Sequence, residues 1–286
     1  MMSSLLLADA WVQVERAIGQ RPQLTGDALA MRAQYKAVND EVNANLVRST
    51  EVAVEDEILD GNLRICLLLA ERLPCVIVSV DYRLAPEHKA PTQLDDAIHA
   101  WTWAYNNATN LNGDCDKYFA IGQSAGGSLA LSVVRQLVVL KRKHEIKGVA
   151  AIVPFTIHPN AVPRRFLDSY RSYNELKNSP VNTREAMDVF YDAIGALETD
   201  PDVYIINAVA NFHQFPPTYL VVCEMDPLRD DGLILNDALQ ASGVPVKMDF
   251  YKGLPHVFWG FNCPAPSGDF VGDVISGVNS FLCTTT

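Results

Sequence analysis

The chain has 286 residues, of which 49% are hydrophobic and 20% charged, a balance that supports one large folded domain and excludes a disordered chain. Its formal net charge of −11 argues against nucleic acid or an anionic membrane surface as a partner.

The first 50 or so residues predict helices, because apolar residues recur at helical spacing from Trp11 to Ile18 and again from Leu29 to Val38. The apolar run Leu5–Ala8 is too short for a signal peptide and lacks basic residues before it. Since no apolar run reaches membrane-spanning length, we expect a cytoplasmic protein without membrane contact.

From residue 51 onward, short apolar segments alternate with amphipathic ones. The expected strands lie near 51–58, 63–66, 76–81, 118–122, 148–153, 219–223 and 246–251. The expected helices lie near 67–73, 91–106, 128–143, 229–242 and 270–282. This alternation predicts an α/β fold with a mostly parallel central sheet and helices on both faces. Residues from about 155 to 215, which carry several prolines, interrupt this alternation of strands and helices and are interpreted as an insertion.

A Gly-x-Ser-x-Gly pattern at 122–126 stands between an expected strand and an expected helix. In that context the pattern predicts a nucleophile elbow, a tight turn that exposes the oxygen of Ser124. The helix N-terminus behind the serine favours developing negative charge. The alternative is a glycine-rich turn with an incidental serine.

A serine nucleophile needs a base and an acid that orients the base. Asp226 follows the strand expected at 219–223, and His256 follows the strand expected at 246–251. Both therefore lie at the carboxyl ends of strands, where sites of open parallel sheets form. Glu224 is the second candidate for the acid, and Asp226 next to Pro227 also fits a helix N-cap.

Four motifs in this order resemble the hormone-sensitive-lipase-like family of α/β-hydrolase esterases. They are DYRLAPEH at 81–88, GQSAGG at 122–127, DPLRD at 226–230 and PHVF at 255–258, and the resemblance covers about residues 25–283. It implies an α/β-hydrolase fold over 1–286 as a single domain, with a helical cap formed from about 1–50 and the insertion at about 155–215. It implies neither a metal nor an organic cofactor.

Carried over residue by residue, the resemblance makes Ser124 the nucleophile, His256 the general base and Asp226 its orienting partner. The backbone N–H of Ala125 would be one oxyanion donor. Gln123 stands where the family usually has an aspartate.

One family feature is missing from the sequence. The family has a strand and a His-Gly-Gly-Gly loop before the DYRLAPEH motif, and the loop's N–H groups form most of the oxyanion hole. This sequence contains no His-Gly pair, and roughly 30 residues are missing between Ile65 and Cys66 by comparison with a strand plus its loop. Losing one oxyanion donor costs about 10²–10³ in turnover, so we expect a weakened enzyme, a differently built hole or an inactive protein.

The expected partner is a small-molecule ester, bound in a pocket under the cap. Candidates for lining that pocket are Gln123, Phe155, Phe212, Phe215 and Trp259. The six cysteines contain no C-x-x-C pair and are expected to be reduced thiols. A homodimer is also possible from the sequence, which does not determine the oligomeric state.

The sequence therefore predicts a serine carboxylesterase for small or medium esters, with the acetyl ester of a secondary metabolite as one candidate. The first alternative is a hydrolase-fold protein that binds a ligand without turnover. The second is an enzyme that uses the same fold for elimination or cyclisation.

Overall fold

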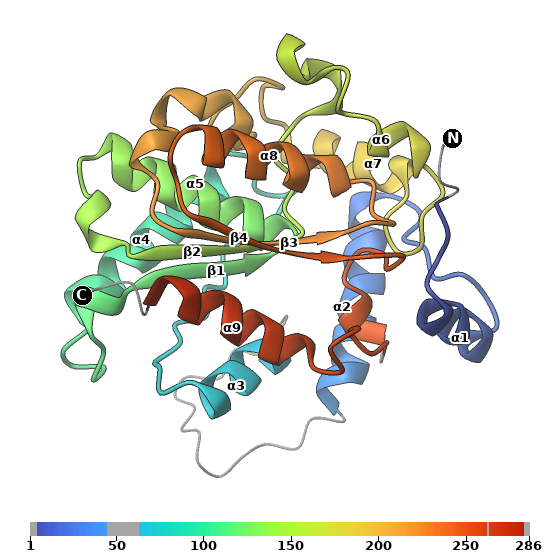
Figure 1. The fold of residues 1–286 in the computed structure, drawn as a ribbon, viewed down its shortest axis with the longest axis horizontal. Coiled ribbons are helices and arrows are strands. Elements are labelled where there is room, and N and C mark those ends of the chain that lie inside the picture. Colours follow the sequence, from blue (N-terminus) through green and yellow to red (C-terminus); the bar gives the residue numbers. More distant parts are fainter. Residues whose placement is uncertain (1–4, 45–62, 262, 283–286) are drawn as a thin grey trace.

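The computed structural model describes residues 5–44, 63–261 and 263–282, which build a parallel sheet covered by helices on both faces (Figure 1). The sheet has the order β1-β2-β3-β4, and all neighbouring strands run parallel. Its strands are β1 (Phe119–Gln123), β2 (Gly148–Ile152), β3 (Thr218–Cys223) and β4 (Val246–Tyr251). These four strands confirm the last four strand predictions to within one or two residues.

The helices alternate with the strands as the sequence pattern predicts. They are α1 (Asp9–Ile18), α2 (Ala28–Ala44), α3 (Leu63–Arg72), α4 (Thr92–Asn106), α5 (Ala125–Val139), α6 (Ser172–Glu175), α7 (Arg184–Ile194), α8 (Arg229–Ala241) and α9 (Phe270–Leu282). Short 3-10 helices occupy Cys115–Lys117, Lys143–Glu145, Pro159–Ala161, Arg164–Phe166, Ile205–Gln214 and Phe258–Phe261. Figure 1 shows α5 and α8 on one face of the sheet and α9 and α3 on the other.

The two central strands explain why both faces are covered. Every residue of β2 and β3 is buried, as in parallel sheets that lie between two helical layers. Successive residues of β2 alternate between two cores: Val149 and Ala151 pack toward α5 and α8, whereas Ala150 and Ile152 pack toward α9. The expected α/β-hydrolase architecture is therefore present.

Two strand predictions are wrong. Residues 63–66 form the first turn of α3, so Ile65 and Cys66 follow each other inside one helix. The helix expected at 67–73 is confirmed and begins four residues earlier.

The segment 76–81 has no strand pairing, and Val76, Val78 and Val80 are 51%, 39% and 37% exposed. The physical reason is that an alternating pattern becomes a strand only beside a partner that bonds its backbone. Within the described residues, β1 pairs with β2 alone and its other edge takes up no strand. The strand expected at 51–58 lies outside the described residues.

The contacts of the N-terminal segment with the insertion include a short parallel bridge. Gln23 pairs with Val181, and the Val181 N–H donates to the Pro22 carbonyl at 2.7 Å. The same N-terminal segment reaches the region around His256, because the Ala8 N–H donates to the Gly253 carbonyl at 2.8 Å. The division into a core and a cap remains a prediction.

The packing of α9 on β3 requires a glycine at position 277. A Cβ there would lie 2.5 Å from ring carbons of Tyr219, whose side chain is fully buried and whose hydroxyl donates to Asp249 at 2.7 Å. We expect Gly277→Ala to lower the free energy of unfolding by about 1–3 kcal/mol, although alanine favours a helix by about 1 kcal/mol. Gly260→Ala is the control, because within the described residues no atom beyond its two chain neighbours lies within 4 Å of its added Cβ. Equal melting temperatures of the two variants would contradict this packing.

Candidate active site

Ser124 occupies the turn between β1 and α5 with a strained backbone. Its φ of 50° and ψ of −121° lie in a region that side-chain-bearing residues rarely adopt. A Cβ at position 122 would lie 2.1 Å from the Gly126 carbonyl oxygen, so only glycine fits there. The Ser124 N–H donates to the Ile152 carbonyl at 2.8 Å, which ties the turn to β2. The geometry is that of the nucleophile elbow predicted from the sequence.

The three predicted catalytic residues lie together at the carboxyl ends of β1, β3 and β4. His256 Nε2 lies 2.9 Å from the Ser124 Oγ, and His256 Nδ1 lies 2.5 Å from the Asp226 Oδ2. Because the carboxylate only accepts, Nδ1 carries the proton, and Nε2 is left to accept from the serine hydroxyl. The side chains of His256 and Asp226 are almost fully buried, which shields this chain of hydrogen bonds from water.

The structure bears on both alternatives for the acid loop, namely Asp226 as a helix cap and Glu224 as the acid. The Asp226 Oδ1 accepts the Leu228 N–H at 3.0 Å, so this carboxylate caps the turn before α8 as well as contacting His256. The Glu224 Oε2 accepts the Gly253 N–H at 2.7 Å. Glu224 therefore holds the loop that leads to His256, and its carboxylate bonds that loop rather than the imidazole.

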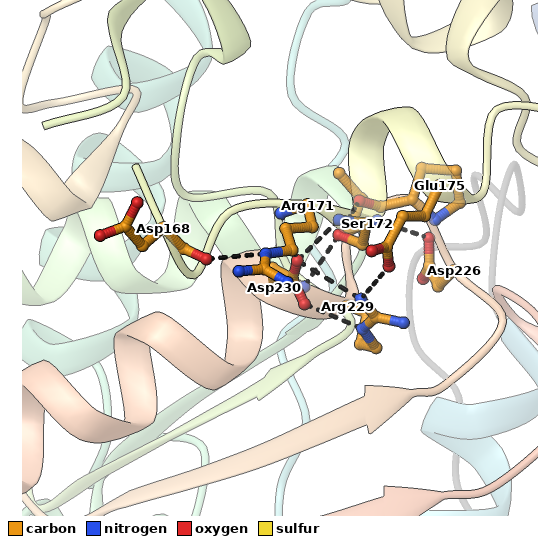
Figure 2. Close-up of polar contacts among 9 residues, drawn as sticks. Asp168, Arg171, Ser172, Glu175, Asp226, Arg229 and Asp230 are labelled. Carbon is orange, nitrogen blue, oxygen red and sulfur yellow. Dashed lines mark hydrogen bonds and ion pairs between the residues drawn. The ribbon is translucent and has the colours of Figure 1, made fainter. Parts of the chain in front are cut away.

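The insertion anchors the start of α8 through Asp230 (Figure 2). The Asp230 Oδ2 accepts the backbone N–H groups of Arg171 and Ser172, both at 2.6 Å. Arg229 pairs with Asp230 at 2.8 Å and with Glu175 at 3.1 Å. These contacts hold α8, and with it the loop of Asp226, against the insertion. Sequence analysis missed this role, although the DPLRD run contained the signal.

Asp231 is a second carboxyl that sequence analysis missed. Its side chain is fully buried, and its Oδ1 accepts the N–H groups of Thr156 at 2.7 Å and Ile157 at 2.9 Å. Burial raises the pKa of Asp231 to about 8, and the nearby charges of Asp226 and Asp230 add to the effect. Asp231 therefore joins α8 to the loop after β2 and keeps its proton at neutral pH.

The candidate donor to an oxyanion is the backbone N–H of Ala125. Ala125 is the first residue of α5, so its N–H has no acceptor within the helix and is available to an oxyanion. Ala125 is exposed. The Ile65–Cys66 junction lies in the first turn of α3, so the chain is helical where the family has its oxyanion loop.

The described residues form a cavity of about 410 Å³. Gln123 and Val257, the chain neighbours of Ser124 and His256, both line it. Trp259 also lines it and donates from Nε1 to the Gln123 Oε1 at 3.2 Å.

Of the five pocket candidates, Gln123 and Trp259 therefore border this cavity, whereas the three phenylalanines do not. Phe155, Phe212 and Phe215 are at most 8% exposed and pack in the core between the sheet and α4, α5 and α8. Sequence analysis placed them at the site because aromatic residues in an insertion look alike whether they face a ligand or the core.

Within residues 5–44, 63–261 and 263–282, His, Cys, Asp and Glu form no group that could hold a metal ion. The described helices include none that is long and apolar enough to cross a membrane. The five described cysteines are unpaired, and burial raises the pKa of the Cys223 thiol well above its usual value, which makes it a poor nucleophile.

The raised pKa of Asp231 predicts how stability depends on pH. Between its ordinary value of 3.8 and about 8, the folded chain holds a proton that the unfolded chain has lost, so stability falls as pH rises. The slope from this group approaches about 1.4 kcal/mol per pH unit. We expect Asp231→Asn, which keeps the acceptor for Thr156 and Ile157, to remove that slope and to exceed the wild type in stability at pH 8. Urea unfolding from pH 5 to 9 measures it, and parallel curves for the two proteins would refute the assignment.

Comparison with known proteins agrees with the observed fold. The α/β hydrolase fold family matches residues 57–260. A versiconal hemiacetal acetate esterase from Dothistroma septosporum is 38% identical over 226 residues, which cover 78% of this chain and 69% of the relative. One from Aspergillus parasiticus is 34% identical over 192 residues, which cover 67% of this chain and 59% of that relative.

Among solved structures, a vibralactone cyclase superposes with a TM-score of 0.87 at 23% identity, covering 100% of this chain and 98% of the cyclase, a likeness that shows the fold alone. The resemblance carried by the four motifs is thus confirmed, and the chain belongs to the α/β-hydrolase fold family, among relatives that include esterases.

Proposed function

We propose that the protein is a serine carboxylesterase that hydrolyses small or medium carboxylic esters through an acyl-enzyme. The observation that carries the proposal is the continuous chain of hydrogen bonds from Asp226 through His256 to Ser124, with the serine on a strained turn at a helix N-terminus.

In the first half of the reaction, the Ser124 Oγ attacks the ester carbonyl while His256 Nε2 accepts the serine proton. Asp226 holds the Nδ1–H tautomer and stabilises the imidazolium that forms. The Ala125 N–H and the positive end of α5 stabilise the oxyanion of the tetrahedral intermediate. His256 then returns its proton to the leaving alcohol, which frees the alcohol and leaves the acyl group on Ser124.

In the second half, a water molecule replaces the alcohol. His256 Nε2 accepts a proton from this water as the water oxygen attacks the acyl carbonyl. Collapse of the second intermediate breaks the bond to the Ser124 Oγ, which regains its proton from His256. The products are a carboxylic acid and the free enzyme.

The names of the relatives support an acetyl ester as the substrate. Versiconal hemiacetal acetate esterases from two fungi are 38% and 34% identical to this chain. We therefore propose the acetyl ester of a secondary metabolite as the physiological substrate class.

One observation favours a second function. Ala125 is exposed, and the chain has the helix α3 at the position where the family's oxyanion loop is missing. A hydrolase-fold protein that binds an ester without turning it over would have these properties. Measurement of turnover separates the two functions.

We expect the purified chain to hydrolyse p-nitrophenyl esters, with a preference that falls from acetate toward decanoate, and we expect Ser124→Ala to abolish the reaction. Reaction of Ser124 with a fluorophosphonate provides a second readout, because it needs the activated oxygen but not complete turnover. Hydrolysis that survives in the folded Ser124→Ala protein would refute the proposal. Absence of both hydrolysis and labelling in a cooperatively folded wild type would favour the binding protein.

Asp226→Asn tests the role of the acid separately from that of the nucleophile. An amide at this position favours the wrong imidazole tautomer, and we expect kcat to fall by about 10⁴. Glu224→Gln is the matched control, because Glu224 bonds the Gly253 N–H and does not contact His256. An equal loss in both variants would mean that the loop geometry, rather than the Asp226 carboxylate, limits turnover.

A further inference from the structure

The cavity beside the triad lies between three helices of one face of the sheet. Its walls come from α2, α3, the 3-10 helix Phe258–Phe261 and the start of α9. Figure 1 shows α3 and α9 on the same side of the sheet, with α2 beside them. Gln123 and Val257 bring the cavity within one residue of both Ser124 and His256.

Trp259 forms a flat wall of this cavity in a fixed orientation. Its ring stacks on Phe270 with centroids 4.0 Å apart and an interplanar angle of 7°. Its Nε1–H donates to Gln123, and the edge of Phe258 packs against it. One face and one edge of the indole are therefore occupied by protein. Trp259 is half-buried and lines the cavity together with Phe270, so a flat ring of a ligand can pack against these aromatic side chains.

The charges in the cavity wall cancel each other. Arg72 forms two parallel hydrogen bonds with Asp269, at 2.9 and 2.6 Å. This pairing lowers the pKa of Asp269 to about 2, so the ion pair persists at neutral pH. Other lining residues are apolar or neutral, among them Tyr35, Val38, Ile65, Leu68, Phe261 and Val271. A neutral ligand loses no solvation of charge here, whereas an ionic ligand finds no unpaired counter-charge.

We propose that this cavity binds a neutral, planar aromatic group of the ester, a fused system of two or three rings, while the ester bond lies at Ser124. The inference rests on the proposed esterase function for the position of the ester bond. Binding of the aromatic group itself depends only on the stack and on the neutral wall. Its volume of about 410 Å³ falls within the range of pockets that enclose small organic ligands.

The first test measures binding without turnover. Ser124→Ala protein is titrated by calorimetry with β-naphthol and with decahydro-β-naphthol, which has the same carbon skeleton and hydroxyl but no aromatic ring. We expect β-naphthol to bind about tenfold more tightly, because only the flat ring stacks on Trp259. Equal affinities, or no binding of either, would overturn the proposal.

Two substitutions then locate the ligand. Leu68→Trp on α3 and Val271→Trp on α9 fill the cavity from different walls, and each is expected to weaken β-naphthol binding by at least about tenfold. Val139→Trp on α5 is the matched control, because Val139 is 49% exposed and α5 lies on the other face of the sheet. If one of the two cavity-filling variants does not unfold cooperatively, β-naphthol binding by the other variant tests the location. Unchanged binding in a folded filling variant would overturn the location.

Kinetics of the wild type separate this inference from the proposed function. We expect β-naphthol to compete with p-nitrophenyl acetate, raising KM and leaving kcat unchanged. Non-competitive inhibition would overturn the placement of the substrate's aromatic group in the cavity. A wild type that binds β-naphthol but hydrolyses no ester would refute the esterase function and leave the cavity as an aromatic binding site.

Discussion

The carboxylate of Asp226 makes two hydrogen bonds on which the geometry of the site depends. One oxygen fixes the imidazole of His256, and the other fixes the turn that opens α8. The second bond makes the position of the acid depend on the position of the helix. That helix is in turn anchored by its next two carboxylates, Asp230 on the insertion and Asp231 on the loop after β2. The position of Asp226 beside His256 thus depends on backbone N–H groups from two segments distant in sequence.

The two anchoring carboxyls differ in charge because their surroundings differ. Asp230 pairs with Arg229, which offsets the loss of solvation on burial. Within the described residues, Asp231 accepts hydrogen bonds from backbone N–H groups and from the hydroxyl of Thr156, and none of these partners is a cation. Burial therefore raises its pKa, and the proton stays. The two adjacent aspartates therefore have different roles. Asp230 forms an ion pair, whereas Asp231 is neutral and accepts hydrogen bonds.

Among the described residues, one edge of β1 pairs with no strand, and Ala125 is exposed. Where the family has a strand and a glycine-rich loop, the described chain passes from α3 into the unpaired segment 76–81. This arrangement leaves the nucleophile elbow intact, because its strain is set by Gly122, Ser124 and the bond to Ile152, all from β1, α5 and β2. The geometry of the turn at Ser124 therefore does not depend on the segment where the family has its oxyanion loop.

The sequence by itself determined the parts of this protein that depend on local pattern. The glycines around Ser124, the placement of Asp226 and His256 after apolar strands and the alternation of strands with helices predicted the sheet and the meeting of the triad. These features follow from backbone sterics and from the common edge at which parallel strands end. Only the tertiary structure decided whether residues 63–66 and 76–81 are strands, because β pairing depends on a neighbour that no local pattern reveals.

The roles of Asp230 and Asp231 and the wall formed by Gln123 and Trp259 were likewise decided by contacts between distant segments. Phe212 and Phe215 illustrate the same limit: an aromatic residue has the same local signature in a core as in a pocket, and only packing separates the two.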